Sequence, residues 1–388
     1  MKHVTVLLLD DGSQYIGTSF GAPAPRVNEI AGGNSLAARA PKGIGEVVFN
    51  TAMSGYHEVL TDPSYTGQLV AMTYPHIGNY GCDPEWSEIG PEEGELPGVK
   101  PAAMIVRSLY TGPVSDGRVT LDQFLADNHT PGITGVDTRA LTLKLRNEGS
   151  RNALLLTPEN GEELSEAEKE AGLRALTGFP TMEGRELIRE VGSRKVVELN
   201  PLGAPHVALL DCGIKANIVR QLLAHECRVT IVPSDFEAAQ LEAVGADALF
   251  VSNGPGDPGV LSHQIGLIKA SIGKRPVLGI CLGHQLIAEA VGAKTYKMKF
   301  GHHGVNHPVR DERTKRVFVT SQNHGFAVDE KSLPDGCEVW FRNANDGSIE
   351  GIVMDDKRIR TTQFHPESAP GPHDSHWIFR SFLDVVGE

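Results

Sequence analysis

The sequence predicts an α/β protein in which a β-rich α/β domain precedes an open, mostly parallel sheet with helices on both faces. The first observation is an alternation after residue 205, where apolar runs such as "HVALLD" and "RVTIVP" alternate with helical patterns such as "KANIVRQLLAHE". This alternation is typical of βαβ units, which build parallel sheets. The second observation is the first half of the chain, where short β-like runs such as "GEVVFNTAM" lie between turns rich in glycine and proline. Because ligands of a parallel sheet bind beyond the carboxyl ends of its strands, we expect the chemistry there.

The length of 388 residues suggests two domains of ordinary size. The linker-like "ELNPLGAPH" leads us to assign residues 1–203 to an N-terminal domain with its linker and residues 204–388 to a C-terminal domain. Near the start, "VTVLLL" ends in two aspartates after six residues, so it is too short for a signal core or a membrane span and predicts a strand. Two helices are predicted over 135–149, with Asp137 as N-cap, and over 159–176. Residues 22–43 and 82–101 have the composition of loops.

Charge and cysteine content argue against several classes of protein. A net charge of −13 disfavours nucleic-acid binding, which needs a basic surface, and docking to an anionic membrane. The five cysteines are odd in number, widely spaced and without a CxxC pair, which disfavours a disulfide framework or a zinc site. We therefore expect a cytoplasmic protein without a metal, nucleic acid or membrane partner.

Two further motifs suggest ligands but fit them poorly. "GPGDPG" (254–259) matches G-x-G-x-x-G after a strand, yet its prolines lack N–H groups and Asp257 would repel a pyrophosphate. We interpret it as a rigid turn that presents the N–H groups of Gly254 and Gly256. "FGHHGVNHPVRD" (300–311) contains three histidines, but its glycines and proline prevent the helix that would align them, so we predict a polar loop.

Cys281, in "PVLGICLGHQLIAEA" (276–290), is either a small buried hydrophobe or a nucleophile. It lies where a strand runs into a helical pattern, with Gly279 and Gly283 on either side, and this is the arrangement of a nucleophile elbow. The helix N-terminus favours the thiolate by only about 0.3–1 kcal/mol, which is less than one pKa unit. Full activation therefore requires a charge partner, usually a histidine.

His365 is the best candidate for that partner. "RIRTTQFHPES" (358–368) predicts a strand ending at His365, at the same sheet edge as Cys281, and Glu367 can orient the imidazole ring. His284 is nearer in sequence, but it lies in the first helical turn and we expect it to pack in the core.

Two backbone N–H groups are candidate donors to a tetrahedral oxyanion, those of Leu282 and Gly254. Together with the cysteine, the histidine and the carboxylate, they predict a cysteine acyl-transfer enzyme. This pattern leaves open whether the substrate is an amide, an ester or a peptide.

The motif "GICLGHQ", with "NGPGDPG" upstream and "QFHPES" downstream, resembles the motifs of class I glutamine amidotransferases in the same order. These enzymes have a flavodoxin-like fold. The resemblance implies that Cys281 attacks the glutamine carboxamide, that His365 acts as base and acid, and that Glu367 orients His365. It also implies that ammonia is released and that the glutamyl thioester is then hydrolysed.

A second resemblance covers nearly the whole chain. "GEVVFNTAMSGYHEVLTDPSYTGQLVAMTYPHIGNYG" (45–81) is similar to the N-terminal domain of the carbamoyl phosphate synthetase small-subunit family, as are "MKFGHHGVNHPV", "SQNHGFAVD" and "HPESAPGPHD". The insertion at 22–43 departs from the compact form expected for this domain. The resemblance implies eight glutamine contacts: Ser64, Gly254, Gly256, Leu282, Gln285, Asn323, Gly325 and Phe326. Ser64 would reach over from the N-terminal domain.

The same resemblance implies a partner chain and no cofactor in this chain. A large subunit would hold the ATP and Mg²⁺ sites and use the ammonia, with bicarbonate, to make carbamoyl phosphate for arginine or pyrimidine synthesis. Three alternatives stay open: the amidotransferase subunit of another glutamine-dependent synthetase, a non-catalytic regulatory subunit, and a dinucleotide-binding oxidoreductase built on "GPGDPG".

Overall fold

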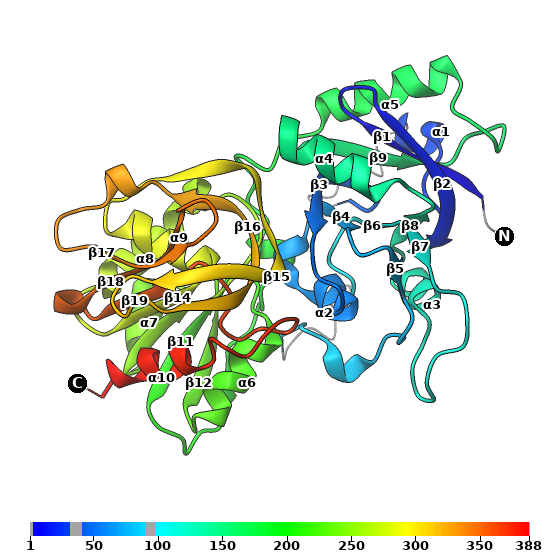
Figure 1. Cartoon of the computed structure of the whole chain (residues 1–388). Helices are drawn as coiled ribbons and strands as arrows, with labels where there is room; N and C mark the ends of the chain where they lie inside the picture. Colours follow the sequence, from blue (N-terminus) through cyan, green and yellow to red (C-terminus); the bar gives the residue numbers. More distant parts are fainter. Residues whose placement is uncertain (1–2, 32–40, 91–97, 388) are drawn as a thin grey trace. The chain divides into compact units, whose positions relative to one another are not determined.

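The computed structural model describes residues 3–31, 41–90 and 98–387, and the chain divides into two compact units (Figure 1). The first unit comprises residues 1–87 and 97–187, and the second comprises 88–96 and 188–388. The sequence-based boundary at 203/204 therefore differs from the structural one, because β10 (Val197–Leu199) pairs with β12 (Arg228–Pro233) of the second unit. No helix within the described ranges is long and apolar enough to cross a membrane.

A closed barrel of seven strands forms the centre of the first unit. Around the barrel the order is β1 (Val4–Leu9), β2 (Gln14–Gly21), β8 (Pro131–Thr134), β6 (Ala103–Val106), β4 (Gln68–Met72), β3 (Ile44–Asn50) and β9 (Arg151–Leu156). The predicted first strand is β1, and five of its six residues are buried. Closure leaves no unpaired strand edge in the barrel. The β-rich character of this half is thus confirmed.

Helices and short elements accompany the barrel. They are α1 (Val27–Ala31), α2 (Tyr56–Thr61), η1 (Pro63–Tyr65), β5 (His76–Ile77), η2 (Pro84–Trp86), β7 (Ser108–Leu109), α3 (Leu121–Asp127), α4 (Thr138–Glu148) and α5 (Glu166–Gly178). The two predicted helices, α4 and α5, are confirmed: Asp137 accepts the Ala140 N–H at 2.9 Å, and Ser165 begins α5 with a capping box. The predicted 22–43 loop contains α1, while its residues 32–40, and residues 91–97 of the predicted 82–101 loop, lie outside the described residues.

The second unit contains a ten-stranded open sheet in the order β10-β12-β11-β13-β14-β19-β18-β17-β15-β16. Its strands, besides those given above, are β11 (His206–Asp211), β13 (Ala248–Val251), β14 (Val277–Ile280), β15 (Thr295–Asp311), β16 (Val317–Val328), β17 (Glu338–Asn343), β18 (Ile349–Met354) and β19 (Ile359–Thr362). The five central strands, β12 to β19, are parallel, and their order along the chain is 2-1-3-4-5, the flavodoxin-like arrangement. This confirms the predicted sheet, which antiparallel strands extend on both sides.

Helices cover both faces of this sheet because alternate strand residues point to opposite faces. On one face, α6 (Ala216–Ala224) and α10 (Trp377–Asp384) pack on apolar side chains that include Val207 and Leu209. On the other face, α7 (Ala238–Val244), α8 (Ser262–Ser271) and α9 (Leu282–Ala290) pack on side chains that include Ala208 and Leu210. Short 3₁₀ turns are η3 (Ile188–Glu190), η4 (Pro258–Val260), η5 (Glu330–Ser332) and η6 (Asp355–Lys357).

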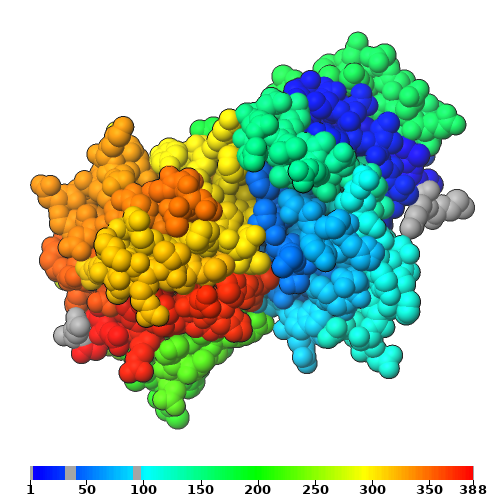
Figure 2. Space-filling view, in the orientation of Figure 1, coloured from blue at the N-terminus to red at the C-terminus, as the bar shows by residue number. Residues whose placement is uncertain are grey.

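The histidine-rich stretch 300–311 is not the predicted polar loop. It lies within the long strand β15, which pairs with β16. The glycines and the proline do rule out a helix, but two register shifts in the β15–β16 pairing, after Lys297 and after Gly304, accommodate them in a strand. In Figure 2 the visible surface of the second unit is formed largely by the C-terminal part of the chain, from β15 onward.

Candidate active site

Cys281 lies at the junction between β14 and α9, at the carboxyl edge of the parallel strands. Its backbone φ of 54° and ψ of −105° are unusual for a residue with a side chain. Such strain at a strand-to-helix turn is the geometry that presents a nucleophile above a sheet. Cys281 N–H donates to Thr362 O of the neighbouring strand at 2.8 Å, and the residue is 3% exposed. The thiol is therefore held in a nearly closed environment.

Glycines make this sharp junction sterically feasible. A Cβ on Gly283 would lie 2.1 Å from Val251 O, and one on Gly279 would lie 2.8 Å from the Gly283 carbonyl carbon. The turn after β13 approaches the junction in the same way, because a Cβ on Gly254 would lie 2.0 Å from Cys212 O and 3.0 Å from Leu282 Cδ2. Leu282 is the first residue of α9, so its N–H precedes the first intrahelical hydrogen bond.

His365 and Glu367 form a buried pair beside this junction. His365 follows β19 by three residues rather than ending the strand, and its N–H donates to Ser321 O at 2.9 Å. Its Nδ1 lies 2.6 Å from Glu367 Oε1, and Nε2 has no hydrogen bond at normal distance within the described residues. Burial lowers the pKa of His365, but the charges of Glu367 and Cys281 outweigh burial and raise it to about 10. The imidazolium is thus the favoured form near Cys281.

Sequence reasoning missed a buried lysine in this cluster. Lys215 Nζ lies 3.2 Å from Glu367 Oε1 and donates to Ser368 O, while Asn217 Nδ2 donates to Glu367 O. Burial raises the pKa of Glu367, but Lys215 and His365 outweigh it and lower this pKa to about 2. No sequence signal marked Lys215, which is the first residue of an ordinary predicted helix, "KANIVRQLLAHE".

His284 is the buried core histidine that the sequence suggested. It is completely buried, its Nδ1 lies 2.7 Å from Thr361 Oγ1, and burial lowers its pKa to about 3. A neutral ring hydrogen-bonded away from the thiol has no role as the base.

The residues predicted to bind glutamine fall in three places of the second unit, with one exception. Gly254 and Gly256 follow β13, Leu282 and Gln285 lie on α9, and Asn323, Gly325 and Phe326 lie on β16. The last two groups meet at Cys281: its Sγ lies 3.4 Å from Asn323 O, and Gln285 Nε2 donates to Phe326 O at 3.0 Å. The exception is Ser64, which lies buried in η1 of the first unit, where Asp62 accepts its N–H at 2.9 Å. Its contact with glutamine stays a prediction.

A histidine cluster brings three potential metal-ligand atoms, from His302, His324 and Glu350, within 4.8 Å of one another. These atoms already belong to a hydrogen-bond network. His302 Nε2 lies 2.9 Å from Asp346 Oδ2, Glu350 accepts from Gln322 Nε2 at 2.9 Å, and His324 Nε2 lies 2.9 Å from Gln322 Oε1. We interpret the cluster as a buried network that stabilises the β16 segment around Asn323.

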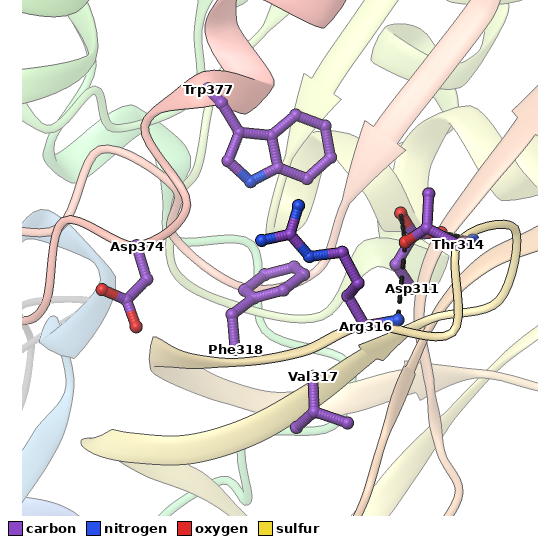
Figure 3. Close-up of a pocket in the computed structure, with 7 residues that line it drawn as sticks. All are labelled: Asp311, Thr314, Arg316, Val317, Phe318, Asp374 and Trp377. Carbon is purple, nitrogen blue, oxygen red and sulfur yellow. Dashed lines mark hydrogen bonds between the residues drawn. The ribbon is translucent and has the colours of Figure 1, made fainter.

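A hollow of about 260 Å³ elsewhere on the second unit contains none of the predicted site residues. Figure 3 shows the side chains that line it, namely Asp311, Thr314, Arg316, Val317, Phe318, Asp374 and Trp377. It offers no nucleophile, so the candidate chemistry stays at Cys281.

The geometry at Cys281 therefore combines a candidate nucleophile, a histidine held by a carboxylate, and backbone N–H groups at the adjacent turn. The family model of class I glutamine amidotransferases matches residues 208–385, and that of the carbamoyl-phosphate synthase small chain CPSase domain matches residues 7–155. The second unit is accordingly a class I glutamine amidotransferase domain.

Relatives extend the match over the whole chain. The carbamoyl phosphate synthase small chain of Archaeoglobus fulgidus is 42% identical over 383 residues, which cover 98% of each chain. The small chain of Akkermansia muciniphila is 41% identical over 98% of this chain and 97% of its own, and that of Pseudomonas syringae pv. tomato is 40% identical over 100% of both. The chain belongs to the carbamoyl phosphate synthase small chain family.

Proposed function

We propose that this chain hydrolyses the side-chain amide of glutamine and supplies the ammonia to a larger partner chain. The observation that carries the proposal is the placement of Cys281 at a strained strand-to-helix junction next to the buried His365–Glu367 pair. Because a cysteine thiolate attacks carbonyl carbon readily, this arrangement suits acyl transfer. Family membership supports glutamine as the amide.

The first half of the reaction forms a thioester. The Cys281 thiolate attacks the carboxamide carbon, and the oxyanion accepts from backbone N–H groups, for which Leu282 and Gly254 are the candidates. The C–N bond then breaks, and ammonia leaves with a proton from His365. Glu367 holds Nδ1 at 2.6 Å, so Nε2 is the nitrogen left to deliver that proton.

The second half returns the enzyme to its starting state. Neutral His365 takes a proton from water, hydroxide attacks the thioester carbonyl, and the C–S bond breaks to give glutamate and the thiolate. The raised pKa of His365 keeps its ring protonated in the resting state.

The partner is a proposal that rests on the family. In it, a large chain holds ATP and Mg²⁺ and combines the ammonia with bicarbonate into carbamoyl phosphate, which serves arginine or pyrimidine synthesis. The five cysteines are free thiols, which supports a reducing compartment such as the cytoplasm.

The decisive experiment compares two nitrogen sources. Cys281→Ser in the full chain, combined with the large chain of a relative, should lose glutamine-dependent synthesis by at least ~10³-fold, because a serine at this position lacks the thiolate. Synthesis from added ammonium chloride should stay at the wild-type rate. Loss of both activities, or survival of the glutamine-dependent one, would contradict the proposal.

A further inference from the structure

Glu88 is a buried carboxylate that the mechanism above does not use. It belongs to the second unit, although residues 1–87 and 97–187 on either side of its segment belong to the first unit. The residue is 1% exposed, and a buried carboxylate is costly unless it is paired and hydrogen-bonded. Its partners therefore indicate what it is there to hold.

Glu88 contacts the first residues of α6 and an arginine further along this helix. This helix has no side-chain N-cap of its own, because its N-cap residue is Lys215, which cannot accept a hydrogen bond. Instead, Ala216 N–H donates to Glu88 O at 3.0 Å, and Asn217 N–H donates to Glu88 Oε2 at 3.0 Å. Arg220 Nη1 lies 2.8 Å from Glu88 Oε1. Glu88 thus caps α6 from a distant part of the chain, where a negative charge favours the helix N-terminus.

The residues at the start of α6 also hold the catalytic carboxylate. Lys215 contacts the side chain of Glu367, and Asn217 contacts its backbone carbonyl. A lysine at a helix N-terminus is unfavourable by itself, so its position depends on nearby carboxylates. A series of contacts therefore connects Glu88 to the start of α6, the start of α6 to Glu367, and Glu367 to His365.

We propose that Glu88 is a positioning residue for catalysis: it fixes the start of α6 so that Lys215 and Asn217 hold Glu367, and through it His365, in place at Cys281. The inference rests on the proposed function. Burial raises the pKa of Glu88 to about 7 against the lowering effects of Lys215 and of the Asn217 N–H. A glutamine at position 88 therefore resembles a protonation state that Glu88 itself reaches near neutral pH.

The test uses Glu88→Gln in the full chain. We expect kcat for glutamine hydrolysis to fall on the order of tenfold to a hundredfold, with KM nearly unchanged, because a displaced base slows chemistry more than binding. The pH profile of Cys281 alkylation by iodoacetamide should also shift, since it reports the thiolate and needs no glutamine. Glu198→Gln is the matched control, because Glu198 pairs with Arg228 at 2.6 Å elsewhere in the same unit.

A second variant separates positioning from folding. Asn217→Ala removes the contact with Glu367 but keeps the backbone N–H that Glu88 accepts. It should shift the alkylation profile in the same direction as Glu88→Gln, even if the latter folds poorly.

Two results would overturn the inference: an Asn217→Ala profile equal to that of the wild type, or a Glu88→Gln variant that melts at a lower temperature yet matches Glu198→Gln in kcat and alkylation. A wild-type chain that hydrolyses no glutamine, alone or with a large chain, would instead reject the proposed function and leave the alkylation test standing.

Discussion

Two buried clusters of histidine and glutamate lie in the second unit, and only one has the features of an active site. In each, carboxylates outweigh burial and raise the pKa of a histidine, His365 to about 10 and His302 to about 9. The difference lies in the remaining ring nitrogen. His302 faces carboxylates through both nitrogens, Asp346 at 2.9 Å and Glu350 at 3.4 Å. His365 uses only Nδ1 for a carboxylate, and Cys281 is close enough to its ring to raise the pKa.

This comparison teaches that a buried histidine–carboxylate pair is not by itself a sign of catalysis. A pair whose two ring nitrogens are both occupied holds strands together. A pair with one nitrogen left for a nucleophile can move a proton. The two clusters should therefore respond to the same substitution in opposite ways.

The largest effect is expected from replacing each histidine by asparagine. His365→Asn should lower kcat for glutamine hydrolysis by about 10²–10⁴-fold, the usual contribution of a general acid–base. His302→Asn should change the kcat of the folded protein much less, but it should lower the free energy of unfolding by about 3–5 kcal/mol, because it leaves the buried Glu350 without its charged partner. Glutamate release and urea unfolding measure the two effects. Equal losses of kcat in both variants would remove the distinction between the clusters.

The sequence allowed the central sheet and the candidate nucleophile with its histidine to be predicted because their signals are local. Each parallel strand is a short apolar run bounded by turns, and Cys281 stands between two glycines at such a boundary. His365 could be linked to Cys281 because adjacent parallel strands end at one edge.

Other features depend on contacts between distant parts of the chain, which no local pattern reveals. Lys215 looks like a surface residue, but burial against Glu367, 152 residues later, makes it part of the site. The stretch around His302 was misjudged because its glycines exclude a helix but not a strand that pairs with β16. The barrel of the first unit likewise depends on which strands pair.

The pH dependence of stability tests the comparison of the two clusters through an effect of intermediate size. The folded-state pKa of His302 is raised from 6.5 to about 9, so its stabilising contribution is fully present below pH 6.5 and is lost as pH rises through about 9. The contribution corresponds to about 3 kcal/mol. The stability difference between wild type and His302→Asn should therefore shrink by about that amount between pH 6 and pH 10 in urea unfolding. His365 titrates in both proteins and cancels from the difference. A difference that stays constant over this range would show that His302 is uncharged in the folded protein.

The smallest effects concern the glycines that shape the catalytic junction. In Gly283→Ala the new Cβ would lie 2.1 Å from Val251 O, and because both groups are backbone in packed elements, neither can move aside cheaply. We expect a loss of about 1–3 kcal/mol in the free energy of unfolding, together with a lower kcat, since the start of α9 must shift relative to Cys281.

Gly266, in the middle of α8, is the matched control, because a Cβ there would meet nothing within 4 Å. Gly266→Ala should stabilise the protein by about 0.4–1 kcal/mol and leave kcat unchanged. Urea unfolding and glutamine hydrolysis of both variants separate the two expectations. If Gly283→Ala behaved like Gly266→Ala, the close approach of β13 to α9 would not be needed to hold the nucleophile, and the elbow would lose its role in distinguishing the catalytic cluster from the histidine cluster.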